Sequence, residues 1–73
     1  MALAYWAIKN SSGWAVKKEG ASRPASVHPT QTEAWAETRR LARGVGGNAY
    51  LKDQDGRIRA QNSYKDFPPS KRG

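Results

Sequence analysis

Alternating apolar and polar positions at the start of the chain predict a β-hairpin. Residues 3–9 are rich in aromatic and branched side chains, and the turn-forming sequence Asn-Ser-Ser-Gly separates them from residues 14–18. In the second strand, Trp14 and Val16 share one face and Lys17 lies on the other, as a period of two requires. We therefore expect Trp14 in the core and Lys17 at the surface.

The first strand is apolar on both faces. Tyr5 and Ala7 share one face and Trp6 and Ile8 the other, so the pattern does not decide which face is buried. A strand of this kind is typical of a sheet that is covered on both sides. We expect a helix on one side and a second subunit on the other.

The clearest local signal is the start of a helix after Thr30. Thr30 and Glu33 have the spacing of a capping box, with the threonine as N-cap. Glycines at 44, 46 and 47 end the helix. Trp35 flanks an apolar stripe at helical spacing, which consists of Ala34, Thr38, Leu41, Ala42 and Val45.

A second hairpin follows the helix. The pair Asp55-Gly56 between two short alternating runs, residues 48–52 and 57–61, is a strong hairpin signal. The residues expected to face inward are Leu51, Ile58 and Ala60. The residues expected to face outward are Tyr50, Lys52, Arg57, Arg59 and Gln61.

Together these elements predict one small α+β domain over residues 1–64, with an antiparallel sheet and one helix in the order ββαββ. Residues 25–28 leave open a short extra strand, because only Val27 there has β character. Residues 65–73 are basic and rich in proline, and we expect them to form a mobile tail. Phe67 is a candidate to pack back onto the domain.

The charge balance suggests an anionic partner. In 73 residues, 13 Lys and Arg oppose six Asp and Glu, which gives a net charge of +7. Such an excess is typical of proteins that bind nucleic-acid phosphates, although solvated sheet faces and helix ends also carry charge. The candidate nucleic-acid-binding residues are Lys17, Lys18, Arg23, Arg39, Arg40, Arg43, Tyr50, Lys52, Arg57 and Arg59.

Residue types argue against an enzyme, a metal site and a cofactor. The chain has no cysteine and a single histidine, His28, which we expect to have a structural role. No nucleophile, base and orienting group can be assembled from the side chains present. Asp53 and Asp55 lack the spacing of a calcium loop and are expected to form a turn.

No apolar run approaches the length of a membrane span, and the apolar start of the chain is too short for a signal peptide. We therefore expect a cytoplasmic protein. A domain of this size without disulfides often depends on a second copy of itself, so we also expect a homodimer or a higher homo-oligomer.

The combined motifs resemble a family of small bacterial and phage proteins known only as a domain of unknown function. The likeness rests on residues 13–17 (GWAVK), residues 19–23 (EGASR), residues 55–58 (DGRI), the Thr30–Glu33–Ala34 helix start, and Ser63-Tyr64 followed by Phe67-Pro68-Pro69. It covers most of the chain and implies a compact ββαββ-like domain without an assigned activity. The first strand departs from the family pattern, with Ala7 and Lys9 where a β-branched residue and a proline are usual.

A weaker resemblance is to sheet-type DNA-binding domains, such as those of some phage integrases and plant ethylene-response factors. These have a Gly-x-Trp strand, to which Gly13-Trp14 is similar, and share a basic strand and a Thr-x-x-Glu-Ala helix start; their sheets enter the major groove. The resemblance implies DNA contacts from Trp14, Lys17, Lys18 and Arg23.

Two functions follow as hypotheses. The first is a nucleic-acid-binding protein, with DNA favoured over RNA, that uses mainly phosphate contacts from a basic sheet face. The alternative is an oligomeric phage or bacterial regulatory or anti-defence protein that binds a protein partner or a nucleotide signal.

Overall fold

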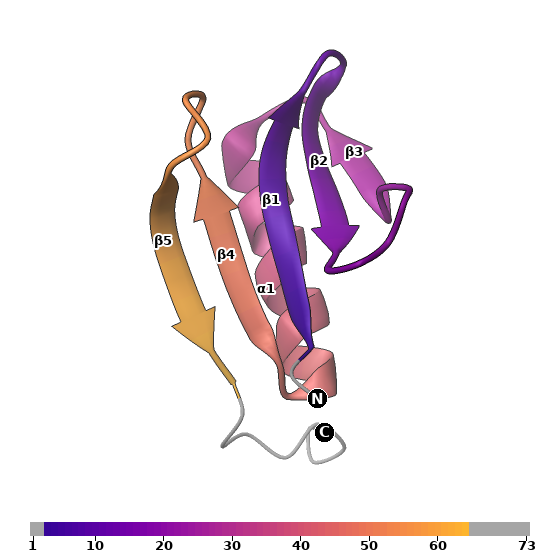
Figure 1. Cartoon of the computed structure of the whole chain (residues 1–73), viewed down its shortest axis with the longest axis vertical. Helices are drawn as coiled ribbons and strands as arrows, with labels where there is room; N and C mark the ends of the chain where they lie inside the picture. Colours follow the sequence, from indigo (N-terminus) through magenta and orange to yellow (C-terminus); the bar gives the residue numbers. More distant parts are fainter. Residues whose placement is uncertain (1–2, 65–73) are drawn as a thin grey trace.

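Five strands and one helix make up the part of the chain, residues 3–64, that the computed structural model describes. The strands form one sheet in the order β3-β2-β1-β4-β5, in which β1 and β4 are parallel and the other neighbours antiparallel (Figure 1). The bounds are β1 (Ala4–Asn10), β2 (Gly13–Lys18), β3 (Ser26–His28), α1 (Gln31–Val45), β4 (Asn48–Lys52) and β5 (Ile58–Ser63).

The predicted α+β class is confirmed, and the segment left open as a strand is β3. The expectation of an antiparallel sheet is wrong for one pair, because β1 and β4 are parallel. Because β3 pairs with β2, the first hairpin becomes a three-stranded unit. The chain then crosses the sheet through α1 and returns in β4, which lies parallel to β1. The predicted tail at residues 65–73, including Phe67, lies outside the described residues.

Both ends of α1 follow the sequence signals. The backbone N–H of Glu33 donates to the Thr30 hydroxyl at 3.1 Å, which confirms Thr30 as the N-cap. At the other end Gly46 is left-handed, with φ of 67°, and Gly47 donates to the Ala42 carbonyl at 2.9 Å. This is the hydrogen-bond pattern of a glycine-terminated helix.

The core lies between α1 and one face of the sheet. Its buried side chains are Ala7, Trp14, Val16, Ala34 and Leu51. The helix contributes only small buried residues, Ala34, Thr38 and Ala42, so its backbone can approach the sheet closely. The Thr38 hydroxyl donates to the Ala34 carbonyl at 2.7 Å and is thereby satisfied. Trp14 is 8% exposed, which confirms it as a core residue.

The facing of the first strand, which the pattern left open, is decided by Ala7. Ala7 is fully buried in the core, and Tyr5 packs against the same cluster. The alternate residues Trp6 and Ile8 therefore point to the face of the sheet opposite α1.

Two expectations about individual side chains are wrong. Ile58, expected inside, is 54% exposed, because an irregularity between Leu51 and Lys52 pairs Ile58 with Lys52 and Ala60 with Leu51. Arg59, expected on the outer face, is the residue skipped by this pairing; its guanidinium turns toward α1 and donates to Gln31 Oε1 at 2.6 Å.

Candidate functional site

The sheet has one face without a helix, and we call it the open face. Figure 1 shows α1 behind the sheet and no element in front of it among the described residues. Strand periodicity and register assign its side chains. Its central members are Trp6, Ile8, Ala15, Lys17, Val27, Tyr50, Lys52, Ile58 and Gln61, and Ala4, Asn10, Asn48 and Ser63 lie on the same face at the strand ends.

Two rows of side chains cross the open face from strand to strand. The first row is Lys17, Trp6, Tyr50 and Gln61, which are consecutive partners across β2, β1, β4 and β5. The second row is Val27, Ala15 and Ile8, across β3, β2 and β1. The two aromatic rings therefore lie in one row and the aliphatic groups in its neighbour; Lys17 belongs to the aromatic row, and Lys52 lies two positions along β4 from Tyr50, opposite Ile58.

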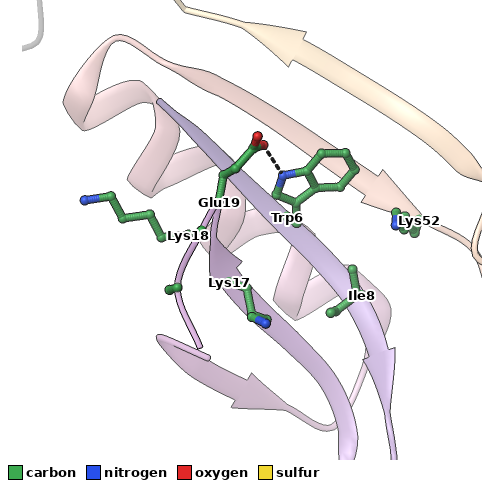
Figure 2. A pocket seen from close by; sticks show the side chains of 8 residues that line it. Trp6, Ile8, Lys17, Lys18, Glu19 and Lys52 are labelled. Carbon is green, nitrogen blue, oxygen red and sulfur yellow. Dashed lines mark hydrogen bonds between the residues drawn. The ribbon is translucent and has the colours of Figure 1, made fainter. Parts of the chain in front are cut away.

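Trp6 is held in place by three other side chains. Its ring stacks on Tyr50, with centroids 4.4 Å apart and planes inclined by 24°. The ammonium group of Lys52 lies 5.0 Å from the Trp6 ring, within the range of a cation–π contact. The indole N–H donates to Glu19 Oε1 at 2.9 Å (Figure 2). The indole is thus an oriented, half-buried ring on an otherwise uncovered face.

A shallow depression with a volume of about 260 Å³ adjoins this indole. Figure 2 shows Trp6, Ile8 and Glu19 around it, with Lys17 in the foreground and the Lys18 side chain extending away from the indole. Its lining residues are Trp6, Ile8, Lys17, Lys18, Glu19, Gly20, Ala21 and Lys52. Tyr50, which stacks on the indole, is not among these residues, whereas Lys52, whose ammonium group lies 5.0 Å from the indole ring, is.

The charges around the depression are predominantly positive. Lys17, Lys18 and Lys52 are opposed by Glu19, whose Oε1 accepts from the indole. Lys17 and Lys52 are half-buried, so their aliphatic stems cover the sheet while their ammonium groups can reach outward. Such a surface attracts anions without closing around them.

The candidate residues predicted from the sequence do not form one patch. Lys17, Tyr50 and Lys52 come together on the open face. Arg23 lies exposed in the loop between β2 and β3, and Arg57 lies exposed in the turn between β4 and β5. The remaining members are Lys18 at the end of β2, Arg59 turned toward α1, and Arg39, Arg40 and Arg43 on α1.

The helix arginines lie on the side of the sheet away from the open face. Arg39 and Arg40 contact side chains of α1 itself. Arg39 lies 5.4 Å from the Trp35 ring. Arg40 makes two hydrogen bonds to Glu37, of 2.6 and 2.8 Å, and these lower the pKa of the Glu37 carboxyl. Arg43 occupies the last turn, where a cation complements the helix dipole. These contacts account for the basic helix end without a ligand.

The open face contains residues that sequence reasoning did not assign to it. The sheet-type DNA-binding resemblance implied Trp14 as the exposed aromatic residue, but Trp14 faces α1. Trp6 has that position instead, and Glu19 orients it. The available signal was the alternation of Ala7 with Trp6, but two apolar faces in one strand gave no way to choose between them.

Within residues 3–64, no group of three or more His, Cys, Asp or Glu side chains is placed to hold a metal ion. The helix in this range, α1, is not long and apolar enough to cross a membrane.

A family model matches residues 5–64, which include α1 and all of the sheet except Ala4, the first residue of β1. The matching family is described as an uncharacterized protein conserved in bacteria (DUF2188). The chain belongs to this family. Comparisons with curated proteins and with solved structures gave no match. The resemblance expected from the motifs is therefore confirmed, and membership in DUF2188 assigns no activity.

Proposed function

We propose that this DUF2188 member is a small nucleic-acid-binding protein that uses its open face, with DNA as the expected ligand. The observation that supports the proposal is the stacked Trp6–Tyr50 pair with Lys17 and Lys52 beside it, on a face that α1 leaves uncovered. Aromatic rings offer stacking surfaces, and lysines neutralise phosphates. The net charge of +7 adds a long-range attraction for polyanions.

Affinity for short DNA across a salt series tests the proposal. We expect affinity to fall as salt rises, because bound phosphates release counterions. The double substitution Lys17→Ala/Lys52→Ala should reduce the slope of log affinity against log salt by about one per lysine.

The matched control is Arg39→Ala/Arg40→Ala, which removes the same net charge from α1. We expect this variant to keep a slope close to that of the wild type. A salt-independent affinity contradicts nucleic-acid binding by phosphate contacts. Equal slope changes in the two double variants contradict the assignment to the open face.

A second candidate function is that of an oligomeric regulatory protein, and the aliphatic row supports it. Val27 is 44% exposed and Ile8 is half-buried, and Ala15 between them is 2% exposed. Such a row is suited to a second copy or to a protein partner. Light scattering discriminates between the two functions: we expect Ile8→Lys to dissociate an assembly built on the open face. A monomeric wild type contradicts this candidate.

A further inference from the structure

The depression beside Trp6 has the features of a site for a single nucleobase. We infer that it receives one unpaired base, stacked on the uncovered part of the Trp6 indole, so that the ligand of the open face is single-stranded nucleic acid. This inference rests on the proposed function and specifies its ligand class.

The Trp6 ring is already held in one orientation. Tyr50 stacks on it at 4.4 Å, and Glu19 fixes the indole edge through a 2.9 Å hydrogen bond. A base that stacks there extends an existing two-ring stack, and little side-chain freedom remains to be lost on binding. Stacking on an aromatic side chain is tolerant of sequence, because every base has a π-face.

The charges around the depression are unevenly distributed. Lys17 and Lys52 line it together with Trp6, and they can neutralise the phosphates that flank a bound base. Glu19 lies at the indole edge and would repel a phosphate there. The neutral base is therefore favoured next to Glu19, and the backbone next to the lysines.

An intact duplex cannot place a base on the Trp6 ring. Bases in a duplex are stacked on one another, so reaching a protein ring requires that one be unstacked and unpaired, at a cost of a few kcal/mol. A single strand does not bear this cost in full. Phosphate contacts from Lys17 and Lys52 remain available to both forms, so the aromatic contribution should appear as a preference for the single strand.

The test compares the wild type with Trp6→Leu for binding to a short single-stranded DNA and to its duplex at one salt concentration. For the single strand we expect Trp6→Leu to bind about five-fold or more weakly, as loss of one stacked base implies, with little change for the duplex. The matched control is Trp35→Leu, which removes a half-buried tryptophan on α1 and should leave both affinities unchanged.

A second readout does not depend on the folding of Trp6→Leu. Saturating single-stranded DNA should quench tryptophan fluorescence in the wild type and in Trp35→Phe. Saturating duplex DNA should quench tryptophan fluorescence much less. A free nucleoside monophosphate is included as a competitor, and we expect it to displace the strand only at far higher concentration, because it lacks the neighbouring phosphates.

The outcomes separate this inference from the proposed function. Salt-dependent binding of duplex and single strand with equal affinity, without quenching, overturns the stacking site and leaves nucleic-acid binding intact. Displacement by the free nucleotide at concentrations comparable to those of the strand overturns the single-strand assignment in favour of a nucleotide ligand. Failure of both DNA forms to bind overturns the proposed function and the inference together.

Discussion

Gly13 shows how one residue determines the placement of a strand. Its φ is 143°, a conformation that L side chains rarely adopt, and an added Cβ would run into the backbone carbonyl oxygen of His28. The absence of a side chain therefore allows β3 to approach the start of β2, where His28 pairs with Trp14. Packing therefore explains the Gly-Trp pair: Gly13 leaves space for the backbone of β3, and the Trp14 side chain is buried in the core beside it.

The substitution Gly13→Ala should destabilise the protein by more than about 1 kcal/mol, because the residue must adopt a strained φ and displace β3. Urea unfolding followed by circular dichroism measures the change. The control is Gly44→Ala, inside α1 with no atom near the added Cβ, which should stabilise by about 0.5 kcal/mol. Equal effects of the two substitutions contradict this role of Gly13.

Among the elements, α1 depends on its N-cap. The Thr30 hydroxyl satisfies the Glu33 N–H, which has no partner inside the helix. We expect Thr30→Ala to lower the free energy of unfolding by about 1 kcal/mol. Thr32→Ala, in the exposed first turn, is the control and should be neutral or slightly stabilising. Urea titration of both variants checks the difference.

The turn between β4 and β5 is organised around the carboxylate of Asp53. Asp53 Oδ1 accepts from the backbone N–H groups of Arg57, at 3.0 Å, and Asp55, at 2.8 Å. The Arg57 bond is the larger cause of a pKa of Asp53 below its ordinary value. A lowered pKa means that the ionised carboxylate stabilises the fold above the ordinary pKa, and that this contribution is lost as pH falls through the folded-state pKa.

Asp53→Asn tests this coupling, because the amide oxygen can still accept both bonds but does not titrate. We expect the variant to be less stable than the wild type near neutral pH, and the difference to shrink as the pH is lowered from about 6 to about 2. Thermal unfolding across this range measures it. Asp55→Asn removes the same charge two residues away, and a pH-dependent difference of the same size there would contradict the role of Asp53.

The elements themselves were largely predictable, because their signals are local. The capping box at Thr30, the Asp55-Gly56 turn and the alternation of Trp14 with Val16 each depend on a few neighbouring residues. Which residues of β5 face the core was not predictable in the same way. It depends on the irregular pairing between Leu51 and Lys52, which carries Ile58 outward and Arg59 toward α1, and nothing in the hairpin sequence marks this irregularity.

At the scale of the whole molecule, the sheet is covered on one face only among the described residues. The helix presents small side chains to Trp14, Val16 and Leu51, and this core leaves Trp6 and Tyr50 on the other face. A half-covered sheet with an aromatic pair and lysines at its centre is suited to an extended anionic ligand. This asymmetry is the structural basis of the proposed function.

The candidate site was less predictable than the fold, because it depends on contacts between distant segments. Lys17, Tyr50 and Lys52 were assigned to a common outer face, and the sheet places them there. Trp6 was assigned to neither face, since its strand is apolar on both faces. Its place beside Tyr50 and its orientation follow only from the parallel pairing of β1 with β4 and from the Glu19 hydrogen bond.

The most direct measurement follows the indole N–H signals of the three tryptophans in a proton–nitrogen correlation spectrum while DNA is added. Trp6 lies on the open face, Trp14 in the core and Trp35 on α1, so each signal reports on a different part of the molecule. The open-face account predicts that the Trp6 signal shifts in proportion to bound DNA while the other two stay in place. A shift of the Trp35 signal with an unchanged Trp6 signal would contradict it.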